Sequence, residues 1–357
     1  MTTRSRTLGL LAAVAAQLLL VSCASSGGSS APAAAPKAVP AAAPTSASQA
    51  PTAGAVDASG QLEKMTVPYT PISGPMAPLW IGVEQKLFEK YGLEVTAQFV
   101  GGSSPITQAL TTGEYDLAVA NGGVAALNRL NGGDIMIVGI HAPTFSIDSW
   151  SKPEIRSIPE LRGKTIGVTR FGSSTHFAAI AMLESAGMQP SDATILQTGG
   201  VSESLAALLS GQMDAVMLAP PQSFEARRAG YHQVALLSEL GEYGLFPETG
   251  IIAREAVLRE PQRRATGVRF MRAFGEALRL AKTDAELTKQ VFRKYAQIDD
   301  EGVLQDTFDF YSKFFPDTLR IDERSIVNMM AFLDHPQARS ADPKLFYDNG
   351  LVDEASR

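Results

Sequence analysis

The feature that most constrains the fold of this chain is an internal repeat. Residues 109–116, with the sequence ALTTGEYD, align with residues 207–214, ALLSGQMD, at an offset of 98 positions. A Gly-Gly pair recurs at the same offset, at positions 101–102 and 199–200. The chain after residue 64 is also longer than a single hydrophobic core usually serves. The repeat therefore predicts two lobes of similar design.

Each copy of the repeat shows the same alternation of short apolar runs, which predict strands, and amphipathic runs, which predict helices. The predicted strands are residues 65–68, 94–99 and 115–120 in the first copy and 165–169, 192–197 and 215–218 in the second. The predicted helices are residues 77–91 and 105–111, then 173–186 and 203–210. This alternation is typical of parallel sheets covered by helices, so we expect two α/β lobes.

The chain after the second copy has a different pattern. Residues 249–253 predict one further strand. Four helices are expected after it, at residues 261–282, 284–296, 301–314 and 323–333. No linker-like composition precedes these helices, so we expect them to complete the first lobe and to support a hinge between the lobes.

The N-terminus carries the pattern of an export signal. Two arginines among the first six residues precede an almost wholly apolar stretch at residues 8–21. This stretch is shorter than the roughly 20 apolar residues that a membrane-spanning helix needs. Cys23, the only cysteine of the chain, ends the segment LVSC, which resembles the lipobox of bacterial lipoproteins. We predict a signal peptide at residues 1–22 and lipid attachment at Cys23; an ordinary secretory signal with a chance cysteine is the alternative.

Residues 23–60 are built mostly from Ala, Pro, Ser, Gly and Thr, so we expect a disordered tether. The full chain has 31 basic and 37 acidic residues, a formal charge of −6. Removing residues 1–22 removes two arginines and no acid, which leaves −8. An acidic, exported chain is a poor candidate for nucleic-acid binding. We expect the protein in the periplasm or on the outer face of the cell membrane, held by the lipid.

The sequence contains no arrangement of residues that indicates an enzyme. Its four histidines do not lie at metal-ligand spacing: they are His141, His176, His232 and His335. The absence of cysteine after Cys23 excludes zinc–thiolate sites and cysteine nucleophiles. No Gly-x-Ser-x-Gly segment or phosphate-binding loop is present. We therefore predict no catalytic residue, no cofactor and no metal.

Loops rich in Ser, Thr and Gly begin several of the expected helices. Helix N-termini offer free N–H groups and a partial positive charge, so such loops can bind polar or anionic ligands. In α/β sheets they lie at the carboxyl ends of the strands. The same residues also cap helices for structural reasons, and this alternative stays open for each loop. The candidate ligand-binding residues are Ser73, Gly74, Gly102, Ser103, Asn121, Gly122, Ser173, Ser174 and Thr175, with Arg170 as the candidate cation.

A series of short motifs follows the same order as in a known family. APLW at residues 77–80 leads to QKLFEKYGLEV at residues 85–95. GEYDLA at residues 113–118, LRGKTIGV at residues 161–168 and GQMDA at residues 211–215 follow. In order and spacing these motifs resemble the substrate-binding proteins of bacterial ABC importers, in the nitrate/sulfonate/taurine group related to thiamine-precursor-binding proteins. One departure is Lys86, where the family pattern has glycine.

The resemblance implies an α/β, type II periplasmic-binding-protein fold, with two α/β lobes, a hinge and C-terminal helices. The first lobe would comprise residues 64–142 plus 247–357, and the second lobe residues 143–246. The chain would cross between the lobes near residues 140–145 and 244–250. A loop at residues 219–222, which contains Pro220, would face the cleft.

Together these observations predict a lipoprotein that binds a small solute between two lobes and delivers it to an ABC permease. Because the candidate loops contain no Asp, Glu or Lys, we expect an anionic or neutral polar solute, such as a sulfonate, nitrate, taurine or a pyrimidine. Tyr69 and Phe171 could stack on an organic ligand or belong to the core, whereas Trp80 fits the core. The alternatives are a ligand-sensing lipoprotein for a membrane receptor and an enzyme on the same fold.

Overall fold

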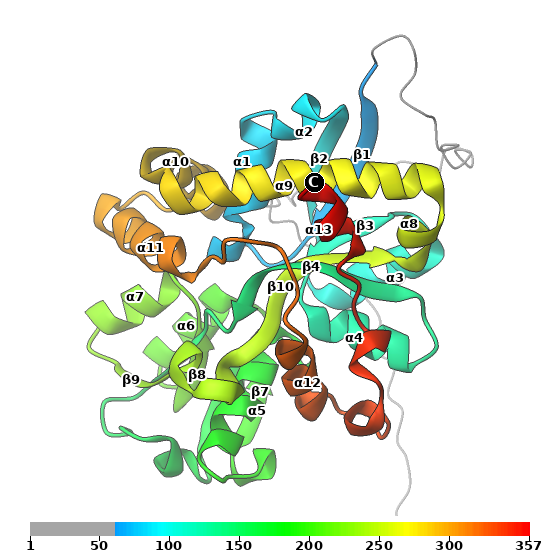
Figure 1. Ribbon diagram of the computed structural model, residues 1–357. Coiled ribbons are helices and arrows are strands. Elements are labelled where there is room, and N and C mark those ends of the chain that lie inside the picture. Colours follow the sequence, from blue (N-terminus) through cyan, green and yellow to red (C-terminus); the bar gives the residue numbers. More distant parts are fainter. Residues whose placement is uncertain (1–60) are drawn as a thin grey trace, which may run out of the picture. The chain divides into compact units, whose positions relative to one another are not determined.

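The structure is a computed structural model that describes residues 61–357. The predicted signal peptide, the lipid-attachment residue Cys23 and the predicted tether lie outside the described residues. None of the helices between residues 61 and 357 combines the length and the apolar content that crossing a bilayer would need. The described residues form two five-stranded sheets with helices packed on both faces (Figure 1).

The first sheet has the strand order β2-β1-β3-β10-β4. Its strands are β1 (Glu63–Tyr69), β2 (Leu93–Phe99), β3 (Leu117–Ala120), β4 (Ile135–Thr144) and β10 (Leu245–Arg254). Strand β1 is parallel to β2 and β3, whereas β10 is antiparallel to both of its neighbours. We call this sheet and the helices on it the first lobe.

The second sheet repeats this design with the order β7-β6-β8-β5-β9. Its strands are β5 (Asp148–Ser151), β6 (Thr165–Val168), β7 (Thr194–Gln197), β8 (Ala215–Leu218) and β9 (His232–Leu236). Strand β6 is parallel to β7 and β8, whereas β5 is antiparallel to both of its neighbours. This sheet and its helices form the second lobe.

The expectation of fully parallel sheets is wrong for one strand in each sheet. Strands β5 and β10 are the first strands that the chain forms after crossing from the other lobe. A chain that arrives from the other lobe enters the sheet at the carboxyl ends of its parallel strands. Each of these two strands therefore runs against its neighbours, and the sheets are mixed.

Helices cover both sheets. The first lobe carries α1 (Ala77–Glu84), α2 (Leu87–Lys90), α3 (Ser103–Thr112), α4 (Gly122–Leu130), α8 (Glu255–Arg259), α9 (Pro261–Thr283), α10 (Ala285–Ala296), α11 (Glu301–Phe314) and α13 (Gly350–Ala355). The second lobe carries α5 (Ser174–Ser185), α6 (Val201–Leu209) and α7 (Gln222–Arg228). Helix α12 (Glu323–Phe332) contacts α4 of the first lobe and α5 of the second. The four helices predicted for the tail are thus α9 to α12.

The helix predicted at residues 77–91 is interrupted, so that prediction is wrong at one point. The chain breaks between α1 and α2 at Lys86, which has a φ of 53°. This left-handed conformation costs a residue with a side chain about 1–2 kcal/mol, which explains why the family pattern has glycine there. The break lets Phe88 stack on Phe270 of α9, with ring centroids 5.0 Å apart.

The buried apolar residues between positions 61 and 357 form three clusters. One lies between the first sheet and α1, α9, α10 and α11. A small one lies between the second sheet and α6 and α7. The third extends through both lobes and includes residues of α3, α4, α5 and α12. The two lobes therefore share a core on the side of α4 and α5, and have separate cores on the side of α7 and α11.

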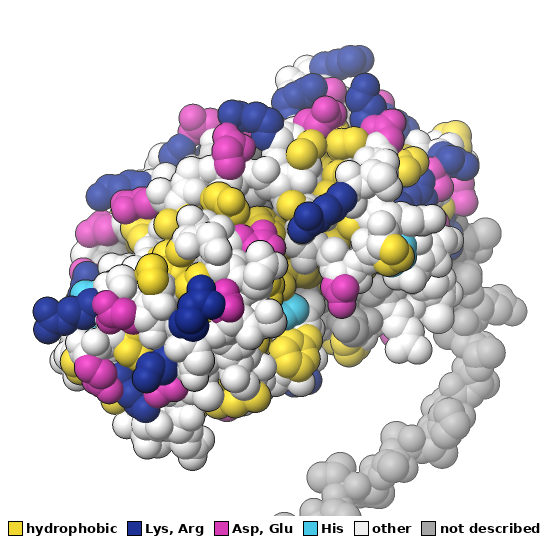
Figure 2. All heavy atoms as spheres, turned by 90° about the horizontal axis from the view of Figure 1, so that it is seen from below, with side chains coloured by type: hydrophobic (Ala, Val, Ile, Leu, Met, Phe, Trp, Pro, Cys, Tyr) yellow, Lys and Arg dark blue, Asp and Glu magenta, His cyan; other side chains and the backbone are white. Residues whose placement is uncertain are grey.

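Acidic and basic side chains are mixed on the face of the molecule that Figure 2 shows. Lysine and arginine side chains lie beside aspartate and glutamate side chains, with hydrophobic side chains visible between them. The charge on this face is therefore not gathered into a patch of one sign.

Candidate functional site

The loops predicted to bind a ligand directly follow strands β1, β2, β3, β6 and β8. Two contacts join loops of opposite lobes. The side-chain amide of Asn121 donates to the Gly172 carbonyl at 3.5 Å, and a Cβ added at Gly102 would lie 3.7 Å from Arg170. Asn121 also donates to the Ser103 hydroxyl at 3.4 Å. The structure thus brings the predicted residues after β2 and β3 together with Arg170 after β6.

The predicted hydroxyl groups after β6 are engaged in hydrogen bonds around the start of α5. Ser173 Oγ accepts from the backbone N–H of His176 at 3.3 Å, and Thr175 Oγ1 accepts from that of Thr169 at 2.9 Å. The Ser174 hydroxyl donates to a backbone carbonyl of β10 at 3.3 Å. The Ser173 bond is the capping role that the sequence left open, whereas the Ser174 bond joins the start of α5 to the other lobe. The part of these residues in ligand binding stays a prediction.

Other predicted residues lie in closely packed surroundings. A Cβ added at Gly74 would lie 1.9 Å from the ring of Tyr311, and one added at Gly122 would lie 2.8 Å from Pro247. These glycines are needed because neighbouring side chains occupy the space that a side chain would fill. Two further predicted residues are buried: Ser73 and Pro220. Their role in binding also stays a prediction.

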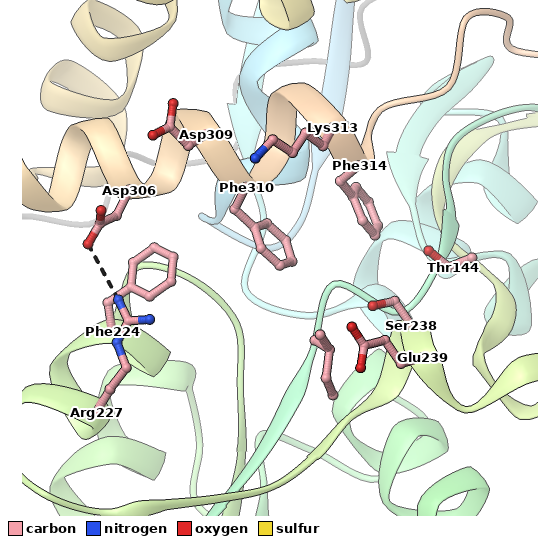
Figure 3. A pocket seen from close by; sticks show the side chains of 11 residues that line it. Thr144, Phe224, Arg227, Ser238, Glu239, Asp306, Asp309, Phe310, Lys313 and Phe314 are labelled. Atoms are coloured by element: carbon pink, nitrogen blue, oxygen red, sulfur yellow. Dashed lines mark hydrogen bonds and ion pairs between the residues drawn. The ribbon is translucent and has the colours of Figure 1, made fainter.

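A cavity of about 580 Å³ lies between the two lobes (Figure 3). One wall belongs to the first lobe and is formed by α11, with the side chains of Asp306, Asp309, Phe310, Lys313 and Phe314. The other wall belongs to the second lobe and is formed by α7 and the end of β9, with Phe224, Arg227, Leu236, Ser238 and Glu239. Thr144, at the end of β4, lies where the two walls meet.

None of the residues predicted from the sequence to bind a ligand lines this cavity. The helix at residues 301–314 is expected from the sequence to complete the first lobe and to support the hinge, and none of its residues is among the predicted ligand-binding residues. A signal was available there, because Phe310 and Phe314 lie one turn apart beside Lys313. The solvent-exposed face of a helix is normally polar. Two phenylalanines beside a lysine on one face therefore indicate a surface that contacts something.

Charged side chains face the cavity from both lobes. Arg227 of α7 forms an ion pair with Asp306 of α11, with 3.5 Å between Nη2 and Oδ2. The Arg227 guanidinium also lies 5.0 Å from the centre of the Phe224 ring. Lys313 on one wall and Glu239 on the other have no ion-pair partner within residues 61–357. Asp309 of α11 also has no ion-pair partner within these residues, so the cavity offers one free cation, Lys313, and two free carboxylates, Glu239 on the second lobe and Asp309 on the first.

Two carboxyl groups are buried where the chain crosses between the lobes. Glu248 in β10 accepts hydrogen bonds from the Ser146 backbone N–H at 2.6 Å and from the Ser146 hydroxyl at 3.0 Å. Tyr311 of α11 donates to the same hydroxyl at 3.5 Å. Burial raises the pKa of Glu248 to about 7, and it raises the pKa of Asp148, at the start of β5, to about 7. Near neutral pH these acids are thus partly protonated.

The aromatic candidates from the sequence differ in their surroundings. Trp80 is fully buried and stacks on Tyr295 at 5.0 Å, and Tyr69 is 5% exposed, so both belong to the core. Phe171 is 55% exposed beside the Arg170 loop and is available to a ligand. Burial lowers the pKa of His176, which packs edge-on against Phe171. Within residues 61–357, His, Cys, Asp and Glu side chains form no group of three that could hold a metal ion.

Proteins that resemble this chain in sequence include two that are named as binding proteins. Residues 75–286 match the model of the family described as NMT1/THI5 like. A Brachyspira hyodysenteriae protein, assigned by name to the periplasmic binding proteins of ABC transporters, is 26% identical over 250 residues, which are 65% of this chain and 69% of that protein. The riboflavin-binding protein RibY of Chloroflexus aurantiacus is 29% identical over 157 residues, 42% of this chain and 44% of RibY.

A solved structure confirms the fold. The alkanesulfonate-binding protein SsuA of Xanthomonas axonopodis pv. citri, bound to MOPS, superposes with a TM-score of 0.63 and 19% identity, over 83% of this chain and 98% of SsuA. The two-lobed periplasmic-binding-protein fold expected from the sequence is therefore present. Since the family model matches more than half of the sequence, the chain belongs to the NMT1/THI5-like family and is a substrate-binding protein of the ABC-importer type.

Proposed function

We propose that this protein is an exported, lipid-anchored solute-binding protein, which captures a small polar organic solute between its lobes and delivers it to an ABC permease. The observation that carries the proposal is the cavity of about 580 Å³ with one wall on each lobe. This volume lies in the range of small-molecule sites. A solute held there contacts both lobes at once.

The charges and the volume support an organic solute with an anionic group. Arg170 after β6 and Lys313 on α11 supply cations at two places between the lobes. The cavity is larger than a nitrate ion needs, and three phenylalanine side chains line it. The relatives named above bind alkanesulfonates and riboflavin, both of which are organic.

The proposed mechanism is closure of two rigid lobes, residues 64–142 plus 247–357 and residues 143–246. The chain passes from β4 to β5 and from β9 to β10, so two short segments carry the motion. A solute that contacts both walls stabilises the closed state, because its binding energy is larger there than in an open state. The permease would recognise the closed form.

A binding screen of the purified chain tests this function. Sulfonates, carboxylates, amino acids, pyrimidines, flavins and nitrate are added singly, and the melting temperature is recorded. Tight binding to the folded state raises the melting temperature by mass action. The proposal expects one chemical class of organic anion to give the largest shift, confirmed by calorimetry. A screen in which no compound shifts the melting temperature contradicts it.

The lipid anchor is tested separately through Cys23. We expect the exported chain to incorporate radiolabelled palmitate and to sediment with membranes. Cys23→Ser should abolish the label and interfere with cleavage of the signal peptide. Thr3→Ser, a change in the same segment outside the lipobox, serves as the control. Release of the unsubstituted chain into the soluble extract without label would contradict the anchor but leave solute binding intact.

A further inference from the structure

We infer that the cavity between α7 and α11 selects a zwitterionic solute, whose anionic group binds Lys313 of the first lobe and whose cationic group binds Glu239 of the second. The inference rests on the proposed function and adds the polarity of the solute and its orientation. Both side chains line the cavity, from α11 and from the turn after β9 (Figure 3).

The assignment follows from how the other charged side chains of the cavity are engaged. Arg227 and Asp306 pair with each other across the lobes. Asp309 accepts a hydrogen bond from the Gln305 amide at 2.9 Å on the exposed side of α11. Within residues 61–357, Lys313 is the one lining cation, and Glu239 the one lining anion of the second lobe, that has no ion-pair partner, so a solute charge can neutralise each without breaking an existing ion pair.

The body of the solute has an apolar counterpart. Phe310 and Phe314 of α11 lie stacked, with ring centroids 5.8 Å apart and an angle of 17° between the planes. Phe224 faces them from α7, with Arg227 over its ring at 5.0 Å (Figure 3). These half-buried rings favour a solute with a flat or apolar centre between its charged ends.

The second-lobe wall has no cation that is free to bind an anionic group of the solute. Its one lining cation, Arg227, is already paired, and the carboxyl of Asp148 is buried close behind it. The Oδ1 atom of Asp148 has no hydrogen-bond partner, and the charges of Glu239 and Arg227 both act on its pKa. A cationic group of the solute is therefore favoured at this wall and an anionic group at the opposite one.

The test uses the purified chain and three probes that share one aromatic ring. The compound 4-(aminomethyl)benzenesulfonate carries both charges, toluene-4-sulfonate lacks the ammonium group, and benzylamine lacks the sulfonate. Affinities are measured by titration calorimetry. A charge-assisted hydrogen bond changes affinity by roughly 10- to 100-fold. We expect the zwitterion to bind at least about tenfold more tightly than either singly charged probe.

Two substitutions separate the two ends. Lys313→Met should weaken the binding of the zwitterion and the sulfonate by about 10- to 100-fold and leave benzylamine unchanged. Glu239→Gln should weaken the zwitterion and benzylamine and leave the sulfonate unchanged. The controls Lys344→Met and Glu154→Gln remove exposed charges elsewhere on the same lobes, and should alter no affinity.

The affinities of the three probes in the two variants distinguish the inference from its alternatives. If Lys313 and Glu239 merely pair with each other when the lobes close, each substitution weakens all three probes by the same factor, which overturns the inference. Unchanged affinities in both variants also overturn it. If other organic anions from the screen bind but the zwitterionic probe does not, the inference fails and the proposed function stands. If no compound binds at all, both fail.

Discussion

The two places where the lobes meet are built differently. On the side of α4 and α5, which we call the packed side, Gly123 of α4 lies against the Phe177 ring of α5, and one buried cluster runs through both lobes. On the side of α7 and α11, the cavity side, the cores of the lobes are separate, and two ion pairs between exposed side chains span them, Arg227–Asp306 and Arg228–Asp300.

The difference indicates which contact can change when a solute binds. Separating the packed side would expose buried aromatic surface, at about 25 cal/mol per Å² of apolar area. Separating the cavity side exposes only rings that are already half in water, and breaks two exposed ion pairs of small value. The packed side therefore acts as the fixed support, and the cavity side as the adjustable part. Four predictions test this division, in order of decreasing effect.

The largest effect is expected from truncating an aromatic residue on each side. Phe177 is 2% exposed and packs on Phe246, with ring centroids 5.2 Å apart. Phe177→Ala should lower the free energy of unfolding by about 3–5 kcal/mol. Phe310→Ala on the cavity side should cost less than half as much, because that ring is already partly in water. Urea unfolding measures both; equal losses would mean that the two sides do not differ.

The second prediction concerns Glu248 and Asp148, the two carboxyl groups that are buried where the chain crosses between the lobes. Burial raises the pKa of Glu248 to about 7 in the folded protein, above the ordinary value of 4.5. Between these values the folded state binds a proton that the unfolded state has lost. The free energy of unfolding therefore falls as the pH rises from about 5 to about 8, by roughly 2–3 kcal/mol.

Glu248→Gln checks this pH dependence, because the amide cannot titrate. Urea unfolding of the variant should show a flatter stability profile between pH 5 and pH 8 than the unsubstituted chain. Asp148→Asn should remove a further part of the slope, since its pKa is raised by burial in the same way. A slope that is unchanged in both variants would show that other groups cause it. Glu154→Gln, at an exposed position, is the control.

Sequence reasoning found most of the fold. The repeated glycines and apolar runs mark two copies of one unit, and the four tail helices follow from their periodicity, because backbone and burial requirements are local. It missed the break at Lys86, since the packing of Phe88 onto Phe270 that accompanies the left-handed lysine joins residues far apart in the sequence. It also missed the antiparallel β5 and β10, whose direction depends on the path of the chain between lobes.

The candidate site was less accessible to such reasoning. The loops after β2, β3 and β6 could be predicted to meet, because strand ends of facing sheets are neighbours by topology. The cavity could not, because it depends on α11 and α7, which lie about 80 positions apart in the chain and whose contact no local pattern encodes. Gly74 and Gly122 lie against Tyr311 and Pro247, a packing requirement that the sequence does not show; their part in ligand binding stays a prediction.

A third prediction tests how tightly the packed side fits. A Cβ added at Gly123 would lie 2.7 Å from the Phe177 ring and 3.2 Å from Asn121 Oδ1. Gly123→Ala should therefore lower the free energy of unfolding by about 1–2 kcal/mol, despite the better helix propensity of alanine. Gly101→Ala is the matched control, because a Cβ there meets nothing within 4 Å. Equal stability of the two variants in urea would show that the packed side yields easily.

The smallest effect is expected for the shorter of the two ion pairs that span the cavity side, Arg227–Asp306. Arg227 and Asp306 are both exposed, so their coupling should be about 0.2–0.5 kcal/mol in a double-mutant cycle of Arg227→Ala and Asp306→Ala. Added salt should reduce it further, since exposed charges are screened over about 10 Å at 0.1 M. A contact this weak can open and close at little cost, as an adjustable wall requires. A coupling above about 1 kcal/mol that persists in high salt would mean that the cavity side is held as firmly as the packed side, and closure would then have to be sought elsewhere.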